Sequence, residues 1–277
     1  MIKTQWELSI EDEKKLRQYL SQSFREVELS RIQEEIEDYY EGKLPPYIIS
    51  ESTDEIMGIL FIQEIDDTTA FARIFTNSNI FLLEVKEVLL EYGIIEVIFE
   101  SSTRLNQVEN LKFEDAEYKM SLSYDKTLEL LNRNTELIKA DELSFVSATK
   151  EDKALYTHLL EVEFDMDAEE ASDRYEMLLN ETKMFPMLVK RNDQTIGISA
   201  YLVGESFITL FDLVIMKQYR GKGQGTKMFL SLLNQIHSPN KKFLLQVTHS
   251  NQIALHLYEK AGFEVEEQLI TYEWHIG

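Results

Sequence analysis

The chain has 277 residues, of which 44% are apolar and 11% aromatic, enough for packed cores in about two domains. With 50 Asp and Glu against 28 Lys and Arg it is strongly acidic, at a formal net charge of -22. Nonspecific nucleic-acid binding needs clustered basic residues that neutralise phosphates, so the charge argues against a nucleic-acid partner. The absence of cysteine excludes disulfides, thiolate metal ligands and a cysteinyl acyl-enzyme.

No apolar run approaches the roughly 18 residues of a membrane span, and residues 1–10 lack the pattern of a signal peptide. We therefore expect a cytoplasmic protein without a membrane partner. The five histidines show no paired metal spacing, and the acidic cluster at 165–170 lacks the glycine of a calcium loop, so no metal is expected. That cluster either starts a solvated helix or attracts a cationic amine.

The first half of the chain begins with a charged helical segment at 11–40, which ends at Gly42 and the pair Pro45-Pro46. The elements predicted after it are strands at 47–49, 56–62 and 69–75, a helix at 80–90, and strands at 94–99 and 120–124.

The second half follows a segment at 126–141 that contains no Gly or Pro and is predicted to be an ordered connector. The elements predicted after it are a strand at 145–148, helices within 151–180, and strands at 187–189, 195–203 and 207–216; then a helix at 226–238, a strand at 242–247, a helix at 252–261 and a final strand at 269–274.

The two halves resemble each other at a spacing of about 140 residues, a period that indicates two related domains rather than a solenoid. The matching positions are Glu11, Asp12 and Leu20 with Glu151, Asp152 and Leu160, Pro46 with Pro186, and Gly58 with Gly197. We expect a first domain at 1–125, a connector at 126–141 and a second domain at 142–277.

A glycine-punctuated turn stands where the strand ending at Met216 passes into the next helix. Gly221, Gly223 and Gly225 alternate with single residues there. The first turn of a helix carries unpaired amides and positive potential, and glycines let an anion approach those amides closely. The spacing fits neither a P-loop nor the dinucleotide fingerprint.

What the spacing does fit is Arg/Gln-x-x-Gly-x-Gly/Ala, through Arg220, Gly223 and Gly225. It resembles the acetyl-CoA pyrophosphate loop of the GNAT N-acetyltransferase superfamily. A second family segment, Asn-x-x-Ala-x-x-Leu-Tyr-x-x-x-Gly-Phe, is matched by Asn251, Ala254, Leu257, Tyr258, Gly262 and Phe263. The resemblance is specific over 207–263. It implies an α/β fold of two tandem GNAT-like domains, each a mixed, mostly antiparallel sheet flanked by helices.

The resemblance also implies the reaction, transfer of an acetyl group from acetyl-CoA directly to a primary amine of a small molecule or peptide. The implied cofactor-binding residues are Leu213, Val214, Ile215, Arg220, Gly221, Lys222, Gly223, Gln224, Gly225, Thr226 and Asn251. Asn251 is equally well explained as a helix N-cap. Tyr258 matches a tyrosine that donates a proton to the departing thiolate, and its alternative is a buried core tyrosine.

The general base is not identified by the resemblance. Thr209 and Gln246 stand where some members carry a glutamate. Asp212 is our first candidate, and Glu205, His249 or a group acting through water are the others. No base is needed if the amine arrives neutral.

The charge distribution agrees with a polyanionic cofactor. Residues 213–258 contain no Asp or Glu, where an even distribution would place about eight. Six cations lie in this window, namely Lys217, Arg220, Lys222, Lys227, Lys241 and Lys242. Coenzyme A phosphates are attracted to such a local field.

The first copy lacks these features. Residues 76–79 replace the glycine loop, Glu84, Glu87 and Glu91 follow in the next helix, and residues 105–113 replace the second family segment. We therefore expect a degenerate domain without cofactor. The alternative function for the whole chain is a catalytically weak or inactive CoA-binding or interaction module.

Overall fold

The computed structural model describes residues 2–4, 7–23, 45, 47–52, 55–76, 80–102, 104–105, 108–139, 143–221 and 223–277. It divides into unit 1, Met1–Glu117 with Gln268–Gly277, and unit 2, Tyr118–Glu267. Residues 24–40 of the predicted N-terminal helical segment lie outside the described residues, as do Pro46, residues 77–79 and Lys222. Among the described residues, no helix is long and apolar enough to cross a membrane.

Unit 2 is built on five strands whose neighbours are antiparallel, except for one parallel pair, β10 with β11. The strands are β7 (Leu143–Ser147), β8 (Met184–Arg191), β9 (Gln194–Val203), β10 (Phe207–Ile215) and β11 (Lys242–Thr248), in the sheet order β11-β10-β9-β8-β7. The helices are α4 (Tyr124–Arg133), α5 (Thr135–Lys139), α6 (Lys153–Phe164), α7 (Ala168–Asn180), α8 (Gln224–Ile236) and α9 (Gln252–Ala261). These elements confirm the predicted fold class.

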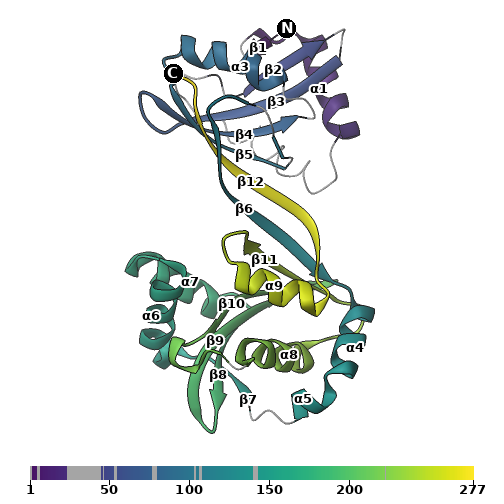
Figure 1. Cartoon of the computed structure of the whole chain (residues 1–277), viewed down its shortest axis with the longest axis vertical. Helices are drawn as coiled ribbons and strands as arrows, with labels where there is room; N and C mark the ends of the chain where they lie inside the picture. The colour runs from purple at the N-terminus through teal and green to yellow at the C-terminus, as the bar shows by residue number, and fades with distance from the viewer. Residues whose placement is uncertain are drawn as a thin grey trace. The chain divides into compact units, whose positions relative to one another are not determined.

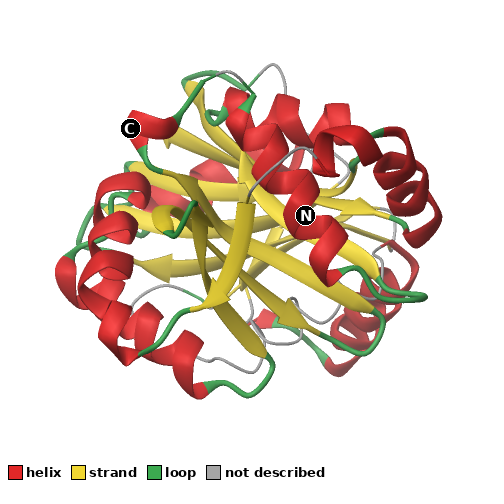
Figure 2. Ribbon diagram, turned by 90° about the horizontal axis from the view of Figure 1, so that it is seen from below, coloured by secondary structure: helices red, strands yellow, loops and turns green. Residues whose placement is uncertain are grey.

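Helices cover both faces of this sheet (Figure 1), and Figure 2 shows helices in red beside the strands in yellow. On one face, α4, α8 and α9 bury residues such as Leu130, Phe229 and Leu255 in a core to which all five strands contribute. On the other face, α6 and α7 pack Tyr156 and Tyr175 against β8, β9 and the end of β10. The amphipathic spacing of these helices, read from the sequence, therefore marks the faces that are buried.

Unit 1 repeats this topology, which confirms the predicted duplication. Its strands β1 (Ile2–Thr4), β2 (Tyr47–Ser52), β3 (Glu55–Glu64), β4 (Thr69–Thr76) and β5 (Glu96–Ser101) follow one another in the sheet in that order. The last two are parallel and are joined through α3 (Ile80–Glu91), as β10 and β11 are joined through α8. Helix α1 (Ile10–Ser23) is the described part of the predicted N-terminal helical segment.

The last strand of the chain differs from its expected place in the second domain. Strand β12 (Glu264–His275) pairs antiparallel with β5 over Ile270–His275, and the end of the chain belongs to unit 1. Burial of Tyr272 and Trp274 beside Phe99 accounts for this pairing.

Strand β6 (Leu111–Leu122) is much longer than the strand predicted at 120–124. Its first half carries charged side chains and therefore lacks the apolar alternation that signals a strand. Charges on β12 pair with lysines of β6, as in Lys112–Glu273 at 3.2 Å in the first half of the strand and Lys119–Glu267 at 3.6 Å in the second half.

A bulge interrupts β10 between Phe211 and Val214, where Asp212 takes a left-handed backbone conformation with φ of 51°. The bulge brings the Val214 carbonyl oxygen against β9, only 2.0 Å from where a Cβ on Gly197 would lie. The equivalent strand of unit 1, β4, pairs with β3 without a register shift from Thr76 to Ala70. The bulge therefore distinguishes the second copy from the first.

We predict that Gly197→Ala lowers the free energy of unfolding by about 2 kcal/mol or more, because the added methyl group overlaps a backbone oxygen. Urea unfolding would measure it. Gly225→Ala is the matched control, since a Cβ there meets no atom within 4 Å and its stability should change by less than about 1 kcal/mol. Equal stability of the two variants would contradict this account of the bulge.

Candidate functional site

The parallel strands β10 and β11 are paired only over their first halves. Their register runs from Phe207 opposite Lys242 to Leu210 opposite Leu245, and the bulge follows immediately. Beyond the bulge the Met216 amide donates to the Ile196 carbonyl oxygen of β9, at 2.9 Å. Because backbone groups alternate sides along a regular strand, the amide of Ile215, next to Met216, faces away from β9, toward the side of β11. Leu213 lies within the bulge itself.

Arg220 holds the turn that follows β10. Its Nε donates to the Ile215 carbonyl oxygen at 2.8 Å, and its guanidinium forms an ion pair with Glu163 of α6. The charge of Arg220 thus fastens the turn to the protein, which is a different use from the phosphate contact implied by the family resemblance.

The glycines give the turn its shape and leave it uncovered. Gly221 and Gly223 have φ of 88° and 75°, and a Cβ on either of them, or on Gly225, would meet nothing within 4 Å. The Lys227 amide donates to the Gly223 carbonyl oxygen at 3.0 Å, so the amides of Gly225 and Thr226 precede this helical bond. They form an open, positively polarised helix start.

Two other predicted cofactor residues are placed as follows. The side chain of Gln224 accepts a hydrogen bond from Arg191, which ties the first residue of α8 to β8. Asn251 caps α9, because its Oδ1 accepts from the Ala254 amide at 3.2 Å.

Tyr258 lies in the core of α8 and α9, with only 7% of its surface exposed. Its ring centroid is 5.3 Å from that of Phe229 and 6.0 Å from that of Phe263. Its hydroxyl has no hydrogen-bond partner among the described residues. Burial raises the pKa of Tyr258 to about 12, so the phenol is neutral and retains a proton that it can donate.

Asp212 is held in a buried ion pair. Arg174 of α7 contacts it through Nη2 at 2.7 Å and through Nε at 3.1 Å, and the Tyr156 hydroxyl lies 3.4 Å away. Burial raises the pKa of the Asp212 carboxyl although Arg174 lowers it. The Arg174 guanidinium also lies over the Phe211 ring, 5.4 Å from its centroid. Arg174 therefore anchors the start of the bulge to α7.

The remaining candidate bases are less constrained. His249 follows β11, and its Nδ1 lies 3.1 Å from the Tyr118 hydroxyl. Gln246 is exposed, as is Glu205.

Sequence reasoning missed Arg174 and Tyr156, because an arginine in an acidic helix is typical of a surface residue. Tyr156 has the spacing of an ordinary buried aromatic residue, so nothing in the sequence indicated its contact with Asp212.

A family model matches most of the second half of the chain. Residues 147–263 match the family model described as Acetyltransferase (GNAT) family. The match confirms, for this segment, the resemblance to the GNAT superfamily seen in the sequence. A sequence search of curated proteins found no match.

Solved structures similar in fold extend the comparison to the whole chain. A tandem GNAT protein from the clavulanic acid biosynthesis pathway is 13% identical, with 100% of this chain and 98% of that one covered, at a TM-score of 0.54. A GNAT-family acetyltransferase from Colwellia psychrerythraea is 13% identical, with 99% of each chain covered, at 0.53. A GCN5-related N-acetyltransferase from Sphaerobacter thermophilus is 10% identical, covering 90% and 85%, at 0.56. The chain has the fold of tandem GNAT proteins.

We predict that Arg174→Met lowers the free energy of unfolding by about 3 kcal/mol, because it leaves the Asp212 carboxylate buried without its charge partner. The control is Lys153→Met, which removes the partly exposed pair between Lys153 of α6 and Glu176 of α7 and should cost less than about 1 kcal/mol. Urea unfolding of both variants would test this, and similar losses would contradict the anchoring role.

Proposed function

We propose that this protein is an N-acetyltransferase that transfers the acetyl group of acetyl-CoA to a primary amine of a small molecule or peptide. The observation that supports this most directly is the combination of divergent parallel strands with an open glycine turn at one end of β10. The strands leave room for an extended thioester arm. The helix start beside them suits its diphosphate.

In this proposal the protein binds acetyl-CoA mainly through its backbone. The amides of Leu213 and Ile215 donate to the pantetheine arm and polarise the thioester carbonyl as an oxyanion hole. The amides of Gly225 and Thr226 receive the diphosphate, with Lys222 and Lys227 adding charge. Arg220 contributes indirectly, by holding the turn, and Asn251 by capping α9.

The chemical step is direct attack by the amine nitrogen on the thioester carbon, aligned by the protein. The C–N bond forms as the C–S bond breaks. Tyr258 gives its phenolic proton to the departing sulfur and regains one from solvent, and the proton lost by the amine passes to water. Asp212, our first candidate for the base, serves better as the anchor of the bulge, because Arg174 occupies its carboxylate. The reaction needs no general base if the amine reaches the site unprotonated.

We also propose that the first copy, at 1–125, binds no cofactor and that the protein is cytoplasmic. The uninterrupted pairing of β4 with both β3 and β5 supports the first point, since it leaves no divergence for a third extended partner. The activity then resides in the second copy.

We predict that Gly225→Glu abolishes CoA binding and leaves the fold intact. The fold is kept because the new side chain enters open space. Binding is lost because its carboxylate repels the diphosphate that the neighbouring amides are proposed to bind. Isothermal titration calorimetry with CoA would measure it, together with the melting temperature. Gly225→Ala should still bind. Undiminished binding by Gly225→Glu would remove the proposed loop from the site.

We predict that Tyr258→Phe lowers kcat about 100-fold, the usual scale for a lost proton donor, with CoA affinity unchanged. Thiol release from acetyl-CoA with a panel of polyamines, aminoglycosides and peptides would show it. Since the pKa of Tyr258 is about 12, the wild-type rate should not fall between pH 8 and pH 10 through loss of its proton. Tight CoA binding without thiol release for any amine would favour the alternative, an inactive CoA-binding module.

A further inference from the structure

Two neighbouring strands of unit 1 gather three metal-binding side chains, which we call the β5–β12 cluster. It consists of Glu96 of β5 with Glu273 and His275 of β12, and each offers one donor atom. The three donor atoms all lie within 4.8 Å of one another. Among the residues that the structure describes, no other three side chains of these types lie so close together.

The register of the two strands brings the cluster together. In the antiparallel pair of β5 with β12, His275 lies directly opposite Glu96, and Glu273 precedes His275 by two residues (Figure 1). Because side chains alternate faces along a strand, all three lie on the same face of the sheet. The intervening residues Val97 and Trp274 are buried on the other face and fix both strands. The backbone therefore holds the donors in place before an ion arrives, which lowers the entropic cost of binding.

The donor set and its spacing suit a zinc-type cation. Zinc binds imidazole nitrogen and carboxylate oxygen at about 2.0–2.2 Å, so two ligands of a tetrahedral ion lie about 3.4 Å apart. In the structure His275 Nε2 lies 3.6 Å from Glu273 Oε1. Three protein ligands leave one position for water. Magnesium and calcium prefer oxygen ligands alone, so the imidazole favours zinc over both.

The charges around the cluster also favour a cation. Lys112 pairs with Glu114 and with Oε2 of Glu273, at 3.2 Å for the latter. Together with Glu96, three carboxylates thus share this ammonium group, and a divalent cation would offset the excess negative charge. Lys112 lowers the pKa of the Glu273 carboxyl, which is therefore ionised at neutral pH, as a metal ligand must be. Because Lys112 contacts Oε2, the Oε1 that lies near His275 is the oxygen for the ion.

We propose that the β5–β12 cluster binds one zinc ion through Glu96, Glu273 and His275, with water as the fourth ligand. The ion joins the end of β12 to β5 and so stabilises unit 1, because it binds only where the two strands are paired. The histidine spacing in the sequence gave no indication of this site, since its ligands come from opposite halves of the chain. The site lies in the first copy and does not depend on the acetyl-CoA site proposed for the second.

Isothermal titration calorimetry of the full chain, without a histidine tag and after treatment with EDTA, would test the proposal. We expect the wild type to bind one zinc ion per chain and to bind magnesium at least 100-fold more weakly. His275→Gln and Glu273→Gln should each weaken zinc binding at least 10-fold, because each removes one of three ligands. Zinc should raise the melting temperature of the wild type and leave that of both variants unchanged.

His256→Gln is the matched control, because it removes an exposed histidine of α9 that lies outside the cluster. It should bind zinc as the wild type does. The assignment is wrong if the wild type binds no zinc, or if His275→Gln binds it as tightly as His256→Gln. Titration of the same proteins with CoA tests the proposed function separately, so the two proposals can fail independently.

Discussion

The bulge in β10 is the constraint on which the candidate site depends. Asp212 lies in a left-handed conformation that costs free energy, and the buried pair with Arg174 keeps it there. The same bulge pushes the Val214 carbonyl oxygen onto Gly197 and turns β10 away from β11. One ion pair between helix and strand thus sets the direction of the backbone amides that the acetyl-transfer proposal requires.

The two copies show what the bulge adds, because they share a topology and differ at this point. In unit 1, β4 and β5 stay paired from Thr69 opposite Glu96 to Ile74 opposite Ser101, and Ser50 of β2 donates to Glu84 of α3. A glutamate carboxylate thus takes a place in the helix that corresponds to the acid-free α8. Pairing and charge both oppose a phosphate ligand there, although the fold is retained.

The sequence was sufficient for features that depend on local pattern. Glycines at 221, 223 and 225 between an apolar strand and an amphipathic helix predicted the open helix start, and Asn251 and Gly262 marked the ends of α9. It was insufficient where partners lie far apart in the chain. Arg174 and Asp212 are 38 residues apart, and Lys112 of β6 is 161 residues from its partner Glu273 of β12. Neither pairing leaves a periodic signal, so Asp212 looked like a free base.

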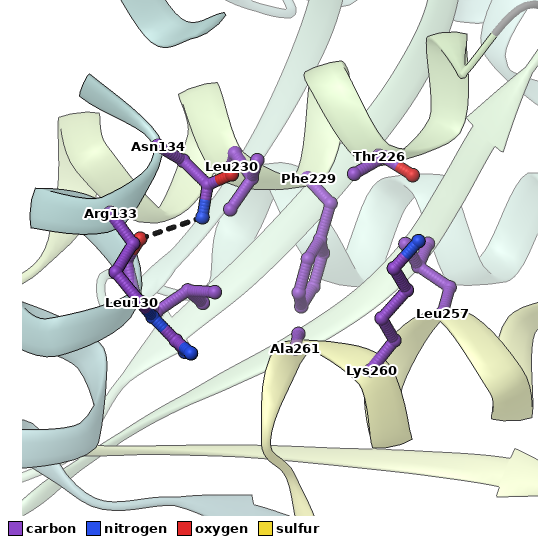
Figure 3. A pocket seen from close by; sticks show the side chains of 9 residues that line it. All are labelled: Leu130, Arg133, Asn134, Thr226, Phe229, Leu230, Leu257, Lys260 and Ala261. Atoms are coloured by element: carbon purple, nitrogen blue, oxygen red, sulfur yellow. Dashed lines mark hydrogen bonds between the residues drawn. The ribbon is translucent and has the colours of Figure 1, made fainter. Parts of the chain in front are cut away.

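The structure shows which cations near the proposed site are already paired with carboxylates, which the charge distribution along the sequence does not show. Arg220 and Lys242 lie in the acid-free window, yet both are paired with carboxylates from outside it, Glu163 and Glu266. Lys260 lies just beyond the window and Arg133 far from it. Both line a pocket between α4, α8 and α9 (Figure 3), and neither has a hydrogen-bond or ion-pair partner among the described residues. The charge near the proposed cofactor site therefore depends on which residues the fold brings together, and not on the acid-free window alone.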